Sequence, residues 1–410
     1  MALSSLGECE TITAIATPFG NGGVGIIRIS GTKALSIYGK LVQGGRGGER
    51  PATRIATVSK LKAGDVEDTA IVLYFPAPHS FTGEDVMELQ LHGGAKLLQH
   101  FLDYIISLGA RLAHAGEFTR RALMNGKMNL AAAESLSTLI HAESEAELTA
   151  ASAQTNGELH AKMLEIERDL TTISAQIWAF IDHPEEVEAP NINKKITSFM
   201  KSLAQFTSNA KAANYIYNGI NVAILGEPNA GKSSLFNQLL GHDRSIVTEI
   251  AGTTTDLVSE TIEINGFKVR LVDTAGIREN PKDKIEKLGI ERTKKAMEEC
   301  DIALVFGDIK VPNKPIIYVK KGSNIAEIKA KIIEKTAKNT HFCAKSMANL
   351  RQINELKLCE VALKNALTAP DIAASASDIQ TALFHISNIT GTNANEAVLD
   401  EIFSKFCLGK

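Results

Sequence analysis

The loop at residues 226–234 constrains the fold of this chain more than any other feature, and it reads Gly-Glu-Pro-Asn-Ala-Gly-Lys-Ser-Ser. The apolar run Val222–Leu225 precedes it and Leu235-Phe236 follows it, so a strand, a loop and a helix start succeed one another. The spacing G-x-x-x-x-G-K-S is that of a P-loop, in which backbone amides surround a phosphate chain, Lys232 supplies positive charge and Ser233 binds magnesium. A chance glycine loop is the alternative, and the strand and helix on its two sides argue against it. The pattern predicts a nucleoside triphosphate site with contacts from Asn229, Ala230, Gly231, Lys232, Ser233 and Ser234.

The bulk properties of the chain indicate a multidomain protein of the cytoplasm. Its 410 residues exceed what one core usually holds, so two or three domains are expected. The formal net charge of −3 gives no general attraction to nucleic acid, and any RNA contact must use a local patch. The five cysteines have no metal-finger spacing and suit a reducing compartment. Since neither a leader-like segment nor an apolar run of membrane-spanning length is found, we expect a cytoplasmic protein without membrane association.

Three compositional zones predict the domain organisation. Residues 1–120 mix short β-rich runs with turn glycines, whereas residues 121–218 and 350–410 have apolar positions at helical spacing. Between the two helical zones, residues 219–349 alternate apolar strands with helices. The economical interpretation is a P-loop domain inserted into a helical domain whose two halves pack together. The predicted fold class is multidomain α/β and α, with an N-terminal α+β domain, a helical-bundle domain and an inserted Ras-like P-loop G domain.

Local patterns also predict individual elements within these zones. In the N-terminal zone we expect strands at Ile12–Thr17, Val24–Ser30, Thr69–Phe75 and Asp85–Leu91, and a helix at Ala95–Leu108. In the helical zones we expect long helices at Leu130–Ala153, Leu159–Phe180, Ile353–Ala366, Ala373–Ile389 and Asn395–Phe406.

A second nucleotide motif lies downstream of the P-loop. The strand Val269–Val272 ends in Asp273-Thr274-Ala275-Gly276, where the aspartate can hold magnesium through water and the glycine lets an amide approach the γ-phosphate. Between the two motifs, residues 252–256 read Gly-Thr-Thr-Thr-Asp and offer Thr254 as a magnesium ligand. The DTAG form favours a GTPase over a generic ATPase. The next residue, Ile277, cannot orient the attacking water as the glutamine of many GTPases does, so another group must do so or hydrolysis must be slow.

The motif that reads guanine in GTPases, Asn-Lys-x-Asp at the end of a later strand, is altered in this chain. The strand Pro315–Val319 is followed by Lys320-Lys321-Gly322-Ser323, so Ser323 stands where the aspartate would accept two hydrogen bonds from guanine. Because a hydrogen bond to a charged partner contributes about 1.5–3 kcal/mol, losing even one weakens guanine preference roughly tenfold to a hundredfold. Phosphate binding is less affected, since the P-loop and magnesium carry it.

The chain also predicts a deletion in this domain. The strands Asp301–Phe306 and Ile316–Val319 should be parallel neighbours, yet only the nine residues Gly307–Pro315 connect them. A parallel crossover with its helix needs about a dozen or more residues. We therefore predict that one crossover helix is lost, and that an extended connection spans the distance without covering the sheet face.

Four blocks outside the P-loop domain carry a resemblance to one family. They are residues 14–18 with 22–30, residues 80–89 (Ser-Phe-Thr-Gly-Glu-Asp-Val-Met-Glu-Leu), residues 116–119 (Gly-Glu-Phe-Thr) and the terminal Phe406-Cys407-Leu408-Gly409-Lys410. Through these blocks the chain resembles the MnmE (TrmE) family of tRNA-modification GTPases over essentially its full length. One departure is Thr255, where the family usually has arginine.

The resemblance implies a folate-binding N-terminal domain through which the protein forms a homodimer. It implies a tetrahydrofolate derivative of the 5-formyl or methylene type as one-carbon donor, and a heterotetramer with the flavoprotein MnmG. Together such proteins add an aminomethyl-type group to the wobble uridine of certain tRNAs. Carried over by motif, the folate contacts are Arg28, Glu88, Lys127 and Lys410. For Arg28 and Glu88 an ordinary strand-end ion pair is the competing interpretation.

The family further resembles potassium-activated GTPases, which implies a K⁺ site in addition to Mg²⁺. The implied K⁺ ligands are Asn229, Thr248, Ile250 and Thr253, those of Mg²⁺ are Ser233 and Thr254, and the catalytic residues are Lys232 and Glu286. A solvated position in a charged helix is the competing interpretation of Glu286. We expect Cys407 to have a structural role near the folate pocket. The implied nucleotide contacts beyond the P-loop are Thr248, Glu249, Ile250, Ala251, Gly252, Thr253, Thr254, Asp273, Thr274, Ala275 and Gly276.

Three functions remain open from the sequence. The leading hypothesis is a GTP-hydrolysing, folate-binding subunit for wobble-uridine modification. The second is a folate-binding scaffold or adaptor for MnmG whose G domain has lost guanine selectivity or turnover. The third is a GTPase switch in ribosome assembly, against which Arg28, Glu88 and Lys410 argue because their blocks lie outside the GTPase core.

Overall fold

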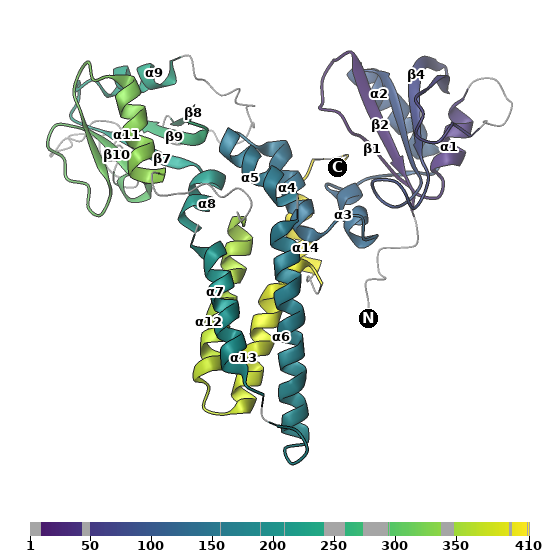
Figure 1. Cartoon of the computed structure of the whole chain (residues 1–410). Helices are drawn as coiled ribbons and strands as arrows, with labels where there is room; N and C mark the ends of the chain where they lie inside the picture. The colour runs from purple at the N-terminus through teal and green to yellow at the C-terminus, as the bar shows by residue number, and fades with distance from the viewer. Residues whose placement is uncertain are drawn as a thin grey trace. The chain divides into compact units, whose positions relative to one another are not determined.

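The computed structural model describes residues 10–42, 50–155, 157–188, 190–208, 210–241, 259–273, 294, 296–337, 348–392, 396–407 and 409. They belong to two compact units, each described here by itself. The first comprises Met1–Ser137 with Thr390–Lys410, and the second is Thr138–Ile389. The C-terminal residues thus pack with the N-terminal ones (Figure 1).

The first unit is built on a six-stranded sheet in the order β3-β4-β5-β2-β1-β6. Its strands are β1 (Ile12–Ile15), β2 (Val24–Ser30), β3 (Thr57–Ala63), β4 (Val66–Phe75), β5 (Val86–His92) and β6 (Arg111–Leu112). Its helices are α1 (Ala34–Leu41), α2 (Ala95–Ser107), α3 (Glu117–Met124) and α14 (Glu396–Ser404), and α4 (Leu130–His141) crosses into the second unit. The strands and the helix predicted for this zone are confirmed to within a few residues at their ends, except that β4 begins earlier than expected.

The alternation of side chains along β2 and β5 separates a core face from a polar face. Ile27 and Ile29 of β2 join Leu89 of β5 in one apolar cluster with residues of α1 and α2. Arg28 and Glu88 lie directly opposite each other in the antiparallel register, on the other face of the sheet. The folding pattern therefore brings these two charged residues together.

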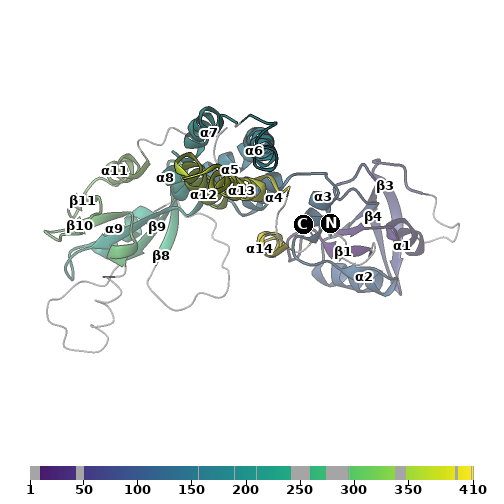
Figure 2. The same cartoon turned by 90° about the horizontal axis from the view of Figure 1, so that it is seen from below.

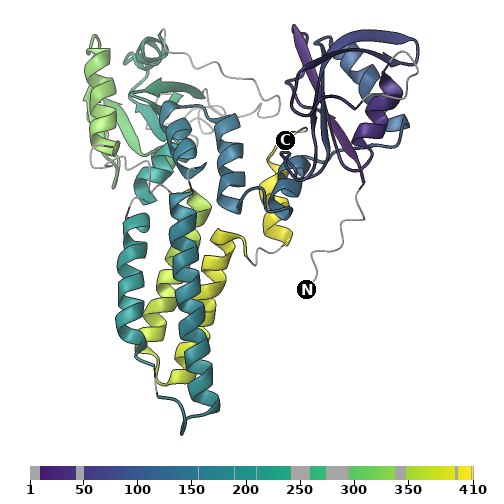
Figure 3. The same ribbon diagram turned by 45° about the vertical axis from the view of Figure 1, so that its right-hand side comes forward.

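The second unit contains a helical bundle formed from two distant segments of the chain. Its helices are α5 (Glu145–Thr155), α6 (Glu158–Asp182), α7 (Ile192–Thr207), α8 (Ala210–Tyr217), α12 (Leu350–Thr368) and α13 (Ile372–Thr390). Helices α6, α7, α12 and α13 lie side by side, and Figure 2 views them end-on (Figures 2 and 3). One apolar core joins Leu170 and Ile173 of α6 to Leu356 of α12 and Ile379 of α13. The two helical halves therefore share a core, while the exact domain boundaries stay predictions.

The long helix predicted at Leu130–Ala153 is wrong, because the chain breaks between α4 and α5. The Ser144 hydroxyl accepts a hydrogen bond from the amide of Glu147 at 3.3 Å, and the Glu147 carboxylate accepts one from the amide of Glu143 at 3.0 Å. A side-chain acceptor for the first amides of a helix favours a new helix start. The S-x-x-E pattern at this position was the signal for the break.

The remaining part of the second unit is a five-stranded sheet in the order β11-β10-β7-β9-β8, parallel except for the β8–β9 pair. Its strands are β7 (Ile220–Leu225), β8 (Ser259–Ile264), β9 (Phe267–Asp273), β10 (Ile302–Phe306) and β11 (Ile316–Val319). Helices α9 (Lys232–Leu240) and α11 (Ile325–Ala337) follow β7 and β11. The carboxyl ends of the four parallel strands β7, β9, β10 and β11 therefore share one edge of the sheet.

The predicted loss of a crossover helix between β10 and β11 is confirmed. The two strands are parallel neighbours, and the connecting residues 307–315, all of them described, contain no helix. The expectation that this connection leaves the sheet face uncovered is wrong. Val311 of the connection is 6% exposed and packs in a cluster with Ala223, Ala303 and Val305. Ile309 of the same connection packs against this cluster, so the short segment covers part of the sheet face with two aliphatic side chains.

Candidate functional site

The P-loop follows the carboxyl end of β7, the middle strand of the sheet. Two of its residues have positive φ, +65° for Asn229 and +105° for Gly231, and α9 begins at the next residue. A Cβ at Gly226 would lie 2.8 Å from the Cβ of Phe306, so only glycine fits beside β10. The loop therefore turns as the sequence predicts and points the amino end of α9 at the strand edge, where backbone amides can bind an anion.

Lys232 is the charged group of this loop. Its side chain is 8% exposed, and its ammonium donates hydrogen bonds to the carbonyls of Gly226 at 3.0 Å and Glu227 at 2.9 Å. Both bonds hold the ammonium across the mouth of the loop, where a phosphate oxygen would compete for the same donors. Ser233, the next residue, is an exposed position in the first turn of α9.

Asp273 is placed by its backbone at the same edge. It ends β9 and is the register partner of Ile224 in the parallel β7–β9 pair. Two motifs that are distant in sequence therefore meet at one strand edge. The side chain of Asp273 and the candidates Glu286 and Lys410 lie outside the described residues. So do the remaining predicted nucleotide and metal residues, which are Thr248, Glu249, Ile250, Ala251, Gly252, Thr253, Thr254, Thr274, Ala275 and Gly276.

The turn that replaces the guanine-reading motif follows β11 at this edge. The Ser323 hydroxyl accepts a hydrogen bond from the Lys320 amide at 2.9 Å, and the Ser323 amide donates to the Lys320 carbonyl at 3.0 Å. Gly322 has a φ of +84°, and the Asn324 side chain accepts from the Ala326 amide at 2.9 Å at the start of α11. The turn is thus an ordered structure closed by its own serine.

A second polar site lies in the first unit around Arg28. The Arg28 side chain pairs with Glu88 at 2.8 Å and donates to the carbonyl of Gly409 at 3.1 Å. Its guanidinium lies 5.6 Å from the ring centroids of both Phe81 and Phe118. The structure thus brings Arg28 and Glu88, two of the four predicted folate residues, together with Gly409. Gly409 directly precedes Lys410, another of the four.

The fourth predicted folate residue, Lys127, packs against the loop that carries one of the family blocks. Its Cε lies 3.1 Å from the position that a Cβ on Gly83 would occupy, and Gly83 has a φ of +80°. Cys407 is exposed, whereas Cys300 and Cys359 are buried. Burial raises the pKa of the Cys359 thiol to about 12, so that thiol is a poor nucleophile at neutral pH.

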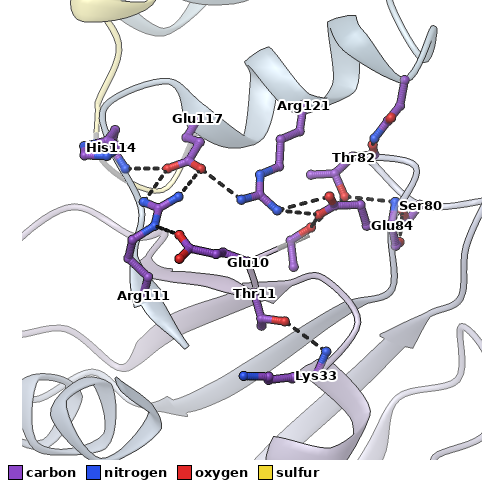
Figure 4. A network of polar contacts seen from close by, with 12 residues as sticks. Glu10, Thr11, Lys33, Ser80, Thr82, Glu84, Arg111, His114, Glu117 and Arg121 are labelled. Atoms are coloured by element: carbon purple, nitrogen blue, oxygen red, sulfur yellow. Dashed lines mark hydrogen bonds and ion pairs between the residues drawn. The ribbon is translucent and has the colours of Figure 1, made fainter. Parts of the chain in front are cut away.

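A network of carboxylates and arginines lies beside this site and was not predicted (Figure 4). Glu117 is 8% exposed and accepts hydrogen bonds from Arg111 at 2.7 Å, from the His114 amide at 2.8 Å and from Arg121 at 3.0 Å. Arg121 also donates to both carboxylate oxygens of Glu84 at 3.0 Å. Burial raises the pKa of Glu117, but the hydrogen bonds outweigh burial and lower its pKa to about 2. Glu84 and Glu117 stand in two of the family blocks, and that was the available signal.

Within the described residues, no group of three or more histidine, cysteine, aspartate or glutamate side chains is arranged to hold a metal ion. None of the helices in the described part of the chain combines the length and apolar character needed to cross a membrane.

The parallel sheet, the loop at the end of its middle strand and the buried lysine at the start of α9 define a P-loop nucleotide-binding protein. Two family models extend this assignment. The model described as the GTP-binding protein TrmE N-terminus matches residues 11–127, and the MnmE helical domain model matches residues 130–407.

Curated relatives agree with both models. The tRNA modification GTPase MnmE of Aquifex aeolicus (strain VF5) is 34% identical over 449 residues, covering 98% of this chain and 100% of the relative. The protein of the same name from Caldicellulosiruptor saccharolyticus is 36% identical, covering 98% of this chain and 100% of that one. The protein from Helicobacter pylori (strain HPAG1) is 37% identical, covering 98% and 97%. A solved structure of Aquifex aeolicus Era bound to GDP.AlF4- is 31% identical, covering 35% of this chain and 56% of that chain with a TM-score of 0.21.

This chain therefore belongs to the MnmE family of tRNA modification GTPases. The alignment with the Aquifex aeolicus relative spans 449 positions, whereas this chain has 410 residues. Some positions of the alignment therefore have no counterpart in this chain.

Proposed function

We propose that this protein is the GTP-hydrolysing and folate-binding subunit of an enzyme that adds an aminomethyl-type group to the wobble uridine of tRNA. The observation that carries the proposal is the P-loop geometry, in which the buried Lys232 ammonium lies across the loop at the start of α9. The full-length match to tRNA modification GTPases supports it.

In the nucleotide site, we assign each residue of the P-loop and of the downstream motifs a task. Lys232 would exchange its bonds to the Gly226 and Glu227 carbonyls for bonds to phosphate oxygens. The amino end of α9 would hold the phosphates through its amides, and Ser233 would bind Mg²⁺ together with Thr254. Asn229, in its left-handed conformation, would bind K⁺ with Thr248, Ile250 and Thr253. A cation there would stabilise charge on the transferred phosphoryl group, with Glu286 orienting the water.

In the first unit, the folate would bind near Arg28, Glu88, Lys127 and Lys410. Arg28 is bonded to Glu88 and Gly409 through its Nε, Nη1 and Nη2 atoms, so its main task would be to hold the C-terminal residues beside the pocket. Glu88 retains a second carboxylate oxygen suited to the paired donors of a pterin. The cationic residues Lys127 and Lys410 suit the anionic glutamyl end of the cofactor.

The assembly proposed with this function follows the family. The protein would form a homodimer through its N-terminal domains and a heterotetramer with the flavoprotein MnmG, and it would act in the cytoplasm on tRNA. The buried network around Glu117 supports the folate assignment indirectly, because it fixes the loop and helix that flank Arg28.

Modification of tRNA by purified components tests this function. The protein, the flavoprotein partner, undermodified tRNA, GTP, K⁺ and a methylene tetrahydrofolate are combined, and the nucleosides are measured by mass spectrometry. We expect modified wobble uridine that depends on both GTP and folate, and a loss of at least tenfold with Arg28→Ala. Arg168→Ala removes the same charge from an exposed position of α6 and should leave the yield unchanged.

One specific observation favours the scaffold as a second candidate function. The lost crossover helix and the altered turn at Lys320–Ser323 both lie in the part of the G domain that follows β10. A protein that binds folate and MnmG but hydrolyses no nucleotide, and whose Lys232→Met variant supports modification normally, would establish the scaffold instead.

A further inference from the structure

The turn after β11 has the wrong chemistry to select guanine. A carboxylate at its fourth position would accept hydrogen bonds from the two N–H groups of the guanine edge, whereas this chain has the hydroxyl of Ser323. That hydroxyl already accepts the Lys320 amide at 2.9 Å, so one of its lone pairs serves the turn itself. Accepting a bond leaves its proton as a donor, and a donor suits the N1 acceptor of adenine as well as any acceptor of guanine.

The charge of the turn also disfavours selection of guanine. An Asn-Lys-x-Asp sequence has one positive and one negative side chain, while Lys320 and Lys321 are both positive and exposed, with no acid among the four residues. Lysine ammonium groups only donate hydrogen bonds. They can meet ring acceptors such as N7, which adenine and guanine share. The turn therefore offers contacts to purines in general.

The phosphate half of the site does not share these changes. Lys232, Gly231 and the start of α9 would contact the triphosphate, whose chemistry is the same in ATP and GTP. The turn at Lys320–Ser323 follows β11, whose neighbour β10 pairs with the P-loop strand β7, so base and phosphate subsites belong to one edge of one sheet. Selectivity and phosphate binding are therefore separable in this chain.

We propose that this nucleotide site accepts purine nucleoside triphosphates without selecting guanine, and that the protein hydrolyses ATP as well as GTP. The inference rests on the proposed function, since it concerns the same site. In either reaction a water oxygen forms a bond to the γ-phosphorus while the bond to the β–γ bridging oxygen breaks. The products are the nucleoside diphosphate, inorganic phosphate and a proton.

The test is the ratio of dissociation constants for GTP and ATP, measured by calorimetry with the non-hydrolysable analogues of both nucleotides in K⁺ and Mg²⁺. We expect the wild-type ratio to lie within about tenfold of one. The double variant Lys320→Asn with Ser323→Asp rebuilds the guanine-reading sequence and keeps a side-chain acceptor for the amide of residue 320. It should shift the ratio toward GTP roughly tenfold to a hundredfold.

The matched control is Asn324→Asp. It adds the same negative charge one residue further along and keeps an acceptor for the Ala326 amide, which the Asn324 side chain now accepts at 2.9 Å. Its ratio should equal that of the wild type. A wild-type preference for GTP of a hundredfold or more overturns the inference alone, and so does a double variant whose ratio does not change. Binding of neither nucleotide overturns the proposed function together with the inference.

Discussion

Arg28 donates a hydrogen bond from Nη1 to the carbonyl oxygen of Gly409 at 3.1 Å, although 381 positions separate the two residues in the chain. The same guanidinium is paired with Glu88 across the β2–β5 register. A hydrogen bond from a charged donor of this kind contributes about 1.5–3 kcal/mol to stability, and this is lost when its partner is removed. The C-terminal residues are therefore an integral part of the first unit.

Replacing Gly409 with alanine should release the C-terminal residues from the sheet. Gly409 has a φ of +91°, and a Cβ there would overlap the carbonyl oxygen of Ile15. We expect backbone amide exchange at Phe406 and Cys407 to rise tenfold to a hundredfold, and binding of 5-formyltetrahydrofolate to weaken by at least tenfold. Gly64→Ala is the control, because Gly64 has a φ of +61° with open space around it. Unchanged exchange in Gly409→Ala would show that the terminus is not held through Arg28.

Glu117→Gln should destabilise the first unit at neutral pH and much less in acid. The folded pKa of about 2 lies below the unfolded value near 4.5, so the stabilisation is present above pH 5 and is lost as the pH falls toward 2. At about 1.4 kcal/mol per pKa unit, the cost at pH 7 is roughly 3 kcal/mol. Amide exchange of α3 at pH 6 and pH 3 should show the difference from wild type shrinking by about half or more.

Glu401→Gln is the comparison for that experiment. Glu401 pairs with Lys405 at 3.2 Å, but both side chains are more than half exposed, and such surface pairs contribute about 0–1 kcal/mol. Its stability should change little at either pH. An effect of Glu117→Gln that does not depend on pH would mean that the carboxylate charge contributes nothing.

The P-loop was predictable because its interactions are local. Lys232 bonds to carbonyls only six and five positions earlier, so the G-x-x-x-x-G-K-S spacing contains nearly the whole geometry. The pairing of Arg28 with Glu88 was also accessible, because period-two alternation places both on one face and leaves only the register to be found. The first prediction needed only local spacing, and the second needed one strand pairing in addition to the local pattern.

The Glu117 network was missed because its members come from separate elements. Arg111 lies in β6, Glu117 and Arg121 lie on α3, and Glu84 lies in the loop before β5. No spacing in the sequence indicates which arginine meets which carboxylate. The covering of the sheet by Ile309 and Val311 was missed for the same reason, since two aliphatic residues in a short connection give no clear periodic signal.

Val311→Ala tests whether the short β10–β11 connection takes over the role of the lost helix. Removing two buried methyl groups should cost about 2 kcal/mol, which corresponds to roughly thirtyfold faster amide exchange in β10 and β11. Val361→Ala is the control, since Val361 of α12 is 53% exposed. Equal exchange in both variants would mean that the connection only spans the strands.

Lys232→Met should remove nucleotide binding while leaving the fold in place. The methionine keeps much of the apolar stem of a side chain that is 8% exposed, but it cannot donate to phosphate oxygens. We expect a loss of at least a hundredfold in affinity for GTP by calorimetry. Lys331→Met in α11, where Lys331 pairs with Glu327 at 2.8 Å, removes the same charge from the same domain and should bind GTP normally.

Steady-state GTP hydrolysis by the purified protein, measured in K⁺ and in Na⁺, tests the central claim most directly. A P-loop with Asn229 in place and an intact Lys232 predicts turnover that K⁺ stimulates at least tenfold over Na⁺, and that Asn229→Ala reduces to the Na⁺ level. No release of phosphate in either salt would contradict the account.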